Sequence, residues 1–499
     1  MIPVMKKSKT DCFYLELGGK PFPMLAGELH NSASSDLVHM QETVWPALRG
    51  LGMNTVLAAV TWESVEPQEG VYNLTLLEGL LQQAQKEGMR LVLLWFGLWK
   101  NGESFYVPEW VKTDRQRFFR ATLANGWETS TISPFCTEAV ERDKQAYVQT
   151  ISWLRDHDPN HTVLMVQVEN ELGLMGCERD HCPAAQAAWQ AEIPPSVQEV
   201  LGITGYWADH PDQGEAFMAW HYAQAVESIA AAGKAVLPLP MYANAWLAQH
   251  PDRAGVYPSG GPVAKLIPLW QKAAPSLDML SPDIYVKDFK TECQRYSAHS
   301  NPLFIPEAAR NAGCVSKCLY AFGEHHTLGF SPFGIEDLQG DFPEEVSEET
   351  LKALNIAASA FESSQTAKGL AEAYTLLNGM YTLLVSGHSR GFLQGTPYEN
   401  GCILRFEEYD VQIDYQEGSY GSGGIILPNA EGFWLVGCNV RFAVLPKLGS
   451  GQAVEILRYE EGSFTDGEWK RKRIMNGDER YDLRLYNIPC ARYVHIHIH

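Results

Sequence analysis

The sequence predicts an α/β protein in which a (β/α)8 TIM barrel is followed by a small antiparallel β-sandwich. Three observations predict this fold. The chain has 499 residues, more than a single hydrophobic core usually serves. From Phe13 to about Gly334, eight short apolar runs alternate with longer helical stretches, as a closed barrel requires. From about Gly387 the pattern changes to short period-two segments separated by turn signals, which is typical of a sandwich.

The first half of the barrel is predicted from four apolar runs that end in polar or aromatic residues. We expect strands over residues 22–29, 54–60, 90–95 and 163–168, and helices over 36–51, 74–87 and 138–156. The leucines of residues 74–87 fall on one helical face, so this helix should pack against the sheet. Parallel barrel strands are buried on both faces, which explains why these runs are almost continuously apolar.

The second half of the barrel contains larger insertions. Residues 177–215 are rich in loop formers, and residues 215–232 have a helical pattern. Strands are expected over 235–242, 277–285, 303–307 and 327–333, and further helices over 351–363 and 366–384. The last of these helices would complete the barrel, so the predicted domains are residues 1–384 and 385–499.

The C-terminal domain is predicted from alternating segments such as GGIILP, GFWLVG and VRFAVLP. The chain ends in HIHIH, which also alternates. We interpret it as a strand or a frayed tail in preference to a metal site.

Charge and composition narrow the possible partners and compartment. The formal net charge of −21 argues against nucleic acid or an anionic membrane as a partner. No run approaches membrane-spanning length and residues 1–19 lack an apolar targeting core, so a cytoplasmic enzyme is expected. The 10 scattered cysteines fit reduced thiols better than a disulfide framework. A homo-oligomer is possible.

One cluster of residues could bind a metal. Cys177, His181 and Cys182 are metal-ligating residue types, but no companion pair of ligands is evident nearby. We therefore expect no metal and no other cofactor, and the cluster remains as an alternative.

The most informative stretch is the end of the fourth strand. Immediately after apolar residues 163–166, the chain carries Gln167, Glu169, Asn170 and Glu171 within five positions. Two carboxylates and two amides at the end of a buried strand are costly to desolvate unless they bind something. A buried carboxyl group there would have a raised pKa, which suits it to donate a proton near neutral pH.

A second stretch has the same form. Residues 302–310, PLFIPEAAR, run from apolar residues directly into Glu307. If both segments are barrel strands, Glu171 and Glu307 lie on the same carboxyl-terminal face, where barrel enzymes place their active sites. Two carboxyl groups so placed make a glycosidase mechanism possible.

These residues resemble a known family. Gln167-Val168-Glu169-Asn170-Glu171 matches the Q-x-E-N-E core of the family 35 glycoside hydrolases, the β-galactosidases. Supporting matches lie at residues 27–32 (GELHNS), 62–72 (WESVEPQEGVY) and 107–110 (VPEW). The sandwich-like tail resembles the small C-terminal domain of a compact bacterial subgroup of this family.

The resemblance implies a role for each matching residue. Glu171 would be the general acid/base and Glu307 the nucleophile of a retaining mechanism, with their carboxyl groups about 5–5.5 Å apart. Asn170 would bond the 2-hydroxyl of the sugar, and Tyr285 would donate to the nucleophile. The remaining expected substrate contacts are Glu28, His30, Glu63, Trp99, Asn244 and Phe333.

The sequence departs from the family pattern in ways that bear on the sugar. The usual Gly-Gly-Pro before the Q-x-E-N-E core is replaced by residues 158–162, DPNHT. Strand three ends FGLW where larger members carry a carboxylate before the tryptophan. An exo-acting β-galactosidase of short oligosaccharides is the leading hypothesis. Another retaining β-glycosidase of the clan (a β-glucosidase or β-mannosidase) and a non-catalytic glycan-binding barrel are the alternatives.

Overall fold

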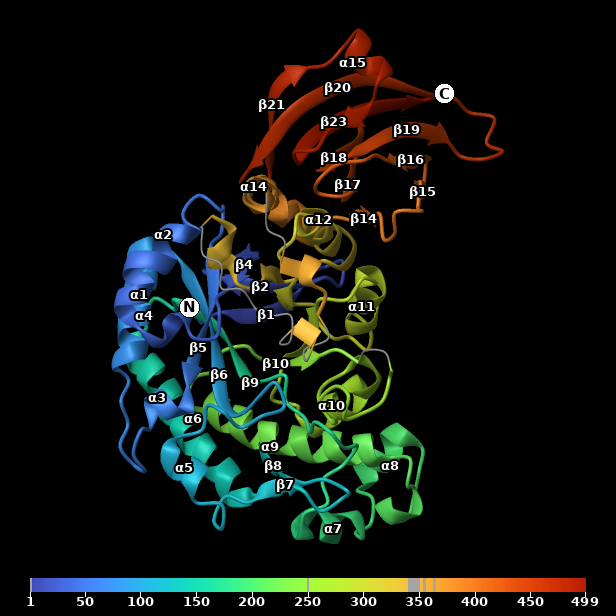
Figure 1. Ribbon diagram of the computed structural model, residues 1–499. Coiled ribbons are helices and arrows are strands. Elements are labelled where there is room, and N and C mark those ends of the chain that lie inside the picture. Colours follow the sequence, from blue (N-terminus) through green and yellow to red (C-terminus); the bar gives the residue numbers. More distant parts are fainter. Residues whose placement is uncertain (1, 249–250, 340–350, 353–355, 362–364) are drawn as a thin grey trace.

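The chain folds into a closed barrel followed by antiparallel sheets, as Figure 1 shows. The structure is a computed structural model that describes residues 2–248, 251–339, 351–352, 356–361 and 365–499. The eight parallel barrel strands follow the chain order, and the predicted fold class is confirmed. They are β4 (Met24–Glu28), β5 (Thr55–Thr61), β6 (Arg90–Lys100), β9 (Val163–Asn170), β10 (Met241–Trp246), β11 (Met279–Ile284), β12 (Ile305–Ala308) and β13 (Gly329–Pro332).

Two predicted strands need correction. Strand β6 does not end at Trp95 but continues to Lys100, because residues 96–99 are also apolar and stay buried. The fifth strand does not cover residues 235–242. Ala235 and Val236 complete helix α9 (Gly214–Val236), and the strand starts only after Pro240. Prolines lack the N–H that a helix or a central strand needs, so they separate the two elements here.

Helices surround the barrel. The main ones are α4 (Thr75–Glu87), α6 (Thr137–His157), α9, α11 (Phe289–Tyr296), α12 (Cys314–His325) and α14 (Thr366–Ser386). The loop-rich insertion also contains α7 (Pro183–Trp189) and α8 (Pro195–Leu201). The helix expected over 36–51 is divided into α1 (Leu37–His39), the π-turn η2 (Met40–Val44) and α2 (Trp45–Leu48). The run expected over 351–363 lies partly outside the described residues and includes the 3-10 turn η6 (Ala358–Phe361). Among the described residues, no helix has both the length and the apolar character needed to cross a bilayer.

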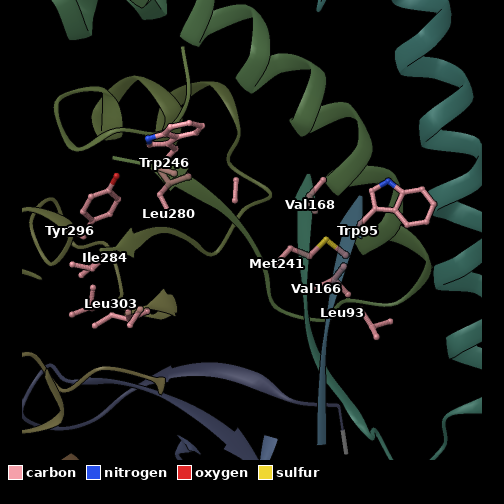
Figure 2. Packing of buried hydrophobic residues seen from close by; sticks show 14 of the residues in the cluster. Leu93, Trp95, Val166, Val168, Met241, Trp246, Leu280, Ile284, Tyr296 and Leu303 are labelled. Carbon is pink, nitrogen blue, oxygen red and sulfur yellow. The ribbon is translucent and has the colours of Figure 1, made fainter. Parts of the chain in front are cut away.

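The barrel strands bury both faces in two different cores. Figure 2 shows Leu93 and Trp95 of β6 beside Val166 and Val168 of β9, in the cluster that also contains the apolar faces of the helices. The alternate residues of β6, at positions 92, 94 and 96, belong to a second cluster that contains no helix residue. Strand β2 (Phe13–Leu17), paired with β1 (Val4–Lys7) and β3 (Lys20–Phe22), adds Leu15 to this second cluster. These layers fix the strand ends that carry the polar residues.

The C-terminal part consists of two antiparallel sheets that share one core. The larger sheet has the order β14 (Arg390–Leu393), β17 (Gly423–Asn429), β18 (Gly432–Cys438), β23 (Cys490–Ile498), β20 (Val454–Thr465) and β21 (Glu468–Ile474). The smaller contains β15 (Gly401–Arg405), β16 (Tyr409–Tyr415), β19 (Val440–Pro446) and β22 (Arg484–Leu485). The HIHIH tail lies mostly within β23, as the strand interpretation expects. The long β20–β21 hairpin was not predicted.

Helix α14 contacts both parts of the chain. The Tyr374 hydroxyl donates to the carbonyl oxygens of Ala26 and Phe330 in the barrel, at 2.7 and 3.0 Å. On the other side, a Cβ on Gly379 would lie 2.3 Å from the carbonyl oxygen of Phe464 in β20, so only glycine fits. The division into residues 1–384 and 385–499 remains a prediction.

Candidate active site

A cavity of about 370 Å³ lies at the carboxyl ends of the barrel strands. One part of its wall is polar and charged, and the other part is aromatic and aliphatic. The residues that line it are His30, Asn31, Lys100, Asn101, Phe105, Glu171, Trp246, Asp283, Tyr285, Glu307, Phe333, Leu351, Ile356 and Phe361. Such a mixture suits a ligand with both hydroxyl groups and an apolar face.

Three carboxyl groups meet in this cavity. Glu171 follows β9, Asp283 lies in β11 and Glu307 lies in β12. One carboxylate oxygen from each lies within 4.8 Å of the other two, and all three residues are at least 94% buried. The structure therefore brings together the two glutamates that the sequence singles out, and adds an aspartate that the sequence analysis did not select.

Glu171 is held in an unusual backbone conformation by two asparagines. Its φ angle is 43°, in the left-handed region that residues other than glycine rarely adopt. The Asn101 side chain donates to the Glu171 carboxylate. The backbone N–H of Glu171 donates to Asn244 Oδ1 at 3.0 Å. Burial, and then the charge of Glu307, raise the pKa of Glu171 to about 7. A carboxyl group with this pKa can both donate and accept a proton near neutral pH.

Glu307 is fixed by a tyrosine. Tyr285 directly follows β11, and its hydroxyl donates to Glu307 Oε2 at 2.8 Å. The other oxygen, Oε1, is buried and has no hydrogen-bond partner within the described part of the chain. A carboxylate with one bonded and one unbonded oxygen presents the unbonded oxygen to a ligand in the cavity.

We expect Tyr285→Phe to lower kcat for glycoside hydrolysis by about tenfold to a hundredfold, because a hydrogen bond to a charged group contributes about 1.5–3 kcal/mol. The substitution removes one oxygen and retains the ring that packs 5.9 Å from Phe361. Steady-state kinetics with an aryl glycoside would measure the effect. An unchanged kcat would show that the bond to Glu307 does not contribute.

Lys100 determines how Asn170 presents its amide. Lys100 is 5% exposed, and its Nζ donates to Asn170 Oδ1 at 2.8 Å. Because an ammonium group can only donate, this bond assigns the Asn170 amide, and Nδ2 becomes the free donor. Nδ2 is buried and lacks a partner among the described residues. Burial lowers the pKa of Lys100, but the neighbouring Glu307, Glu171 and Glu28 outweigh it and the pKa is raised, so the lysine stays charged.

Glu169 points away from the cavity. Simple strand alternation would place it on the same face as Glu171, but its φ angle of 64° turns it outward against Asp143 of α6. Its carboxyl group accepts the backbone N–H groups of Leu98 and Trp99 at 3.2 and 2.7 Å and contacts the buried Asp143 carboxyl group. Glu169 therefore supports the end of β6, which carries Lys100.

His30 and Glu28 extend the polar wall. His30 Nε2 contacts Asp337 Oδ2 at 2.8 Å, and Arg310 pairs with the same carboxylate at 2.7 Å. Burial lowers the pKa of His30, but the Asp337 bond and the charge of Glu336 outweigh it, so the pKa is raised. Glu28 is fully buried below the cavity. Burial, and then Glu307, raise the pKa of Glu28 well above its ordinary value.

Most of the residues predicted for the site lie in or beside the cavity. Those that line it are Glu171, Glu307, Tyr285, His30 and Phe333, while Asn170, Asn244 and Glu28 are buried next to lining residues. Glu63 and Trp99 do not lie in the cavity. Glu63 pairs with Lys112 at 2.8 Å beside a different pocket. Trp99 is fully buried and donates to the Ile132 carbonyl oxygen, so it has no exposed face for a sugar.

Sequence reasoning missed Lys100, Asn101 and Asp283 as site residues. The available signal was their position. Lys100 and Asn101 follow the apolar run of β6, and Asp283 precedes Tyr285 by two residues, the spacing that places two strand residues on one face.

The structure does not assemble the cysteine–histidine alternative. Cys182 caps helix α7 and contacts Ser133, and His181 contacts Gln186. Within the part of the chain that the structure describes, the group of carboxylate, histidine or cysteine ligands close enough to share an ion is Glu171, Asp283 and Glu307, which does not include Cys177, His181 or Cys182.

The buried glutamate pair lies at the carboxyl ends of the barrel strands, where barrel enzymes place their active sites. Residues 14–218 match the family model described as glycosyl hydrolases family 35, which confirms the resemblance seen in the sequence. Residues 370–485 match a domain of unknown function, DUF5597, which begins within α14. No curated protein matches the chain.

Solved structures with similar folds include several glycosidases. The β-galactosidase from Rahnella sp. R3 has a TM-score of 0.50 and 13% identity over 73% of this chain and 57% of that chain. The β-galactosidase from Bacillus circulans sp. alkalophilus has a TM-score of 0.47 and 15% identity over 70% and 56%. The exo-β-1,4-mannosidase Op5Man5 from Opitutaceae bacterium strain TAV5 has a TM-score of 0.43 and 15% identity over 75% and 62%. The chain thus spans less than two thirds of the length of each. At these identities the Rahnella likeness concerns the fold alone.

Proposed function

We propose that the chain is a retaining, exo-acting β-galactosidase that releases terminal β-linked galactose from short oligosaccharides. One observation carries this proposal. Glu171 and Glu307 are buried in one cavity with carboxylate oxygens within 4.8 Å of each other. Retaining glycosidases have carboxyl groups about 5–5.5 Å apart, whereas inverting enzymes need about 6.5–9.5 Å to admit a water molecule between them.

The mechanism assigns one role to each glutamate. Glu307 attacks the anomeric carbon through its unbonded Oε1 while Glu171 protonates the departing glycosidic oxygen. Glu171, now a carboxylate, then takes a proton from water, which attacks the glycosyl-enzyme and releases Glu307. The pKa of about 7 at Glu171 suits both steps.

The sugar would be held by groups around this pair. Asn170 Nδ2, which the Lys100 bond leaves as the free donor of the amide, would donate to the 2-hydroxyl, where hydrogen bonds strengthen in the transition state. The apolar wall, which includes Trp246 and Phe333, offers surfaces for the apolar face of the ring. The cavity of about 370 Å³ suits an exo-acting enzyme that binds one terminal sugar.

The test is hydrolysis of a panel of aryl β-glycosides: galactoside, glucoside, mannoside, fucoside, xyloside and arabinoside. We expect the galactoside to have the highest kcat/KM, by at least about tenfold, because a buried polar group left unpaired by the wrong hydroxyl costs about 1–3 kcal/mol. Preference for another sugar would retain the mechanism and overturn the galactose specificity. No hydrolysis of any member, or of β-galactosyl oligosaccharides, would favour a glycan-binding role.

A further inference from the structure

A third carboxyl group lies between the proposed acid/base and the nucleophile. Asp283 is 3% exposed, and its Cα is the register partner of Glu307 on the neighbouring strand β12. One of its oxygens lies within 4.8 Å of oxygens from both Glu171 and Glu307. Double displacement needs only two carboxyl groups, so the mechanism leaves Asp283 without a role.

Asn244 links Asp283 to Glu171. The Glu171 backbone N–H donates to Asn244 Oδ1 at 3.0 Å, so the Asn244 Nδ2 group must face the other way. It donates to Asp283 Oδ2 at 2.7 Å. The second oxygen, Asp283 Oδ1, is buried and receives no hydrogen bond from any donor group of the described residues. It remains available for the carboxyl group of Glu171, one oxygen of which lies within 4.8 Å of an Asp283 oxygen.

Two carboxylates cannot form a hydrogen bond with each other, because neither carries a hydrogen. A hydrogen bond between Asp283 and Glu171 therefore requires that one of the two groups is protonated. The charges that face Asp283 favour this, since Glu307 on β12, Glu171 after β9 and Glu28 on β4 all contribute negative charge. Tyr242, Tyr285 and Tyr296 are the tyrosines that interact electrostatically with it. Lys100, the lysine in the cavity wall, is bonded to Asn170.

The electrostatic cost of ionising Asp283 or Glu171 identifies which of the two carboxyl groups keeps its proton. Like charges in a buried cavity repel each other more strongly than they would in water. Asp283 faces three acidic neighbours, and Asn244 occupies only one of its oxygens. Burial, and then Glu307, Glu171 and Glu28, raise the pKa of Asp283 well above its ordinary value. Glu171, with a pKa of about 7, receives a hydrogen bond from Asn101 and ionises first.

We propose that Asp283 is a positioning residue that keeps its proton throughout the reaction and donates it in a hydrogen bond to Glu171. Because Glu171 is the acid/base only under the proposed function, this role rests on that function. When the bond from the anomeric carbon to Glu307 forms and the glycosidic bond breaks, the Glu171 proton moves to the leaving oxygen. The new Glu171 carboxylate is stabilised by the Asp283 O–H, which does not transfer. In the second step water returns a proton to Glu171, and Asp283 is unchanged.

The test is the pH dependence of kcat/KM for the preferred aryl glycoside in Asp283→Ala and Asp283→Asn. Alanine removes the donor, so we expect kcat to fall by about tenfold to a hundredfold and the basic limb to move up by about one pH unit. Asparagine imitates a protonated aspartate, accepting from Asn244 and donating to Glu171. It should bring the basic limb back to the wild-type position and recover most of the lost rate. Ser281→Ala, on the same buried strand, is the matched control and should leave the limb in place.

Two results would overturn the proposal. If Asp283 is ionised, Asp283→Asn removes a negative charge beside Glu171 and the basic limb moves down by a unit or more. If the role is only structural, alanine and asparagine change the rate without moving the limb.

A readout independent of activity separates this proposal from the proposed function. At about pH 7, where an ordinary aspartate is ionised, the infrared spectrum of the wild type should contain a protonated carboxylic acid band that Asp283→Asn lacks. A wild type with this band but without glycosidase activity would overturn the proposed function while keeping the protonated Asp283. An active wild type without the band would overturn the proposal for Asp283 alone.

Discussion

Glu307→Ala is expected to lower kcat for aryl galactoside hydrolysis by at least about a thousandfold, because it removes the group that forms the covalent intermediate. Its two neighbours in the carboxyl cluster cannot replace it. Glu171 is needed as the acid, and Asp283 Oδ2 is occupied by Asn244. The fold should survive, because among the described residues the lost side chain forms a hydrogen bond only with Tyr285.

Added azide distinguishes the roles of the two glutamates. In Glu307→Ala, azide can attack the anomeric carbon from the vacated face, so it should restore turnover and give the α-galactosyl azide. In Glu171→Ala, an aryl galactoside with a good leaving group still forms the glycosyl-enzyme, and azide should then give the β-galactosyl azide. Proton NMR of the products identifies each anomer. The opposite pair of products would exchange the two assignments, and Glu192→Gln, an exposed glutamate, is the control for nonspecific loss.

The paired glutamates were predictable because the signal was local. At Glu171 and at Glu307 an apolar strand changes to carboxyl groups without a turn between them, and parallel strands place such ends on one face. Tyr285 was expected from the family resemblance alone, and the structure places its hydroxyl 2.8 Å from Glu307 Oε2.

The remaining parts of the site depend on backbone φ angles and on where strands end, which the pattern of apolar and polar residues does not determine. The φ angle of 64° at Glu169 reverses the expected side of that residue, and positive φ values outside glycine are too rare to be predicted from pattern. Strand β6 was cut short at Trp95, so Lys100 was not recognised as the end of a strand. Trp99 was expected to stack on the sugar because it is aromatic and close to a strand end, but the longer strand buries it.

The second large effect concerns the carboxyl pair behind the cavity. Glu169→Ala should lower the free energy of unfolding by about 3 kcal/mol, because it leaves the buried N–H groups of Leu98 and Trp99 without an acceptor. The Asp143 carboxyl group also loses one of its partners and retains the Trp95 indole N–H, which donates to Oδ1 at 2.8 Å. The pair packs closely against residue 97, where a Cβ would lie 2.5 Å from Asp143 Oδ1 and 2.7 Å from Glu169 Oε1. Chemical denaturation would measure the loss, and activity should fall with it because residues 97–99 support Lys100.

The pair also makes stability depend on pH, with a sign fixed by its pKa shifts. Burial raises the pKa of Asp143 to about 6, and burial and Asp143 raise the pKa of Glu169 well above its ordinary value. Both folded pKa values exceed the unfolded values of about 4, so the folded state binds more protons. The contribution is complete below about pH 4 and is lost as pH rises through about 6, at up to about 1.4 kcal/mol per pH unit for each proton.

Glu169→Gln separates this effect from packing. Its amide can accept from the Trp99 N–H and donate to an ionised Asp143, so no shared proton is needed. Stability should stay within about 1 kcal/mol of the wild type near pH 5, and it should decline less between about pH 5 and 8. Denaturation curves for both proteins across this range give the comparison. Parallel declines would show that Asp143 and Glu169 are both ionised in the folded state, and that residues 97–99 are held by hydrogen bonds alone.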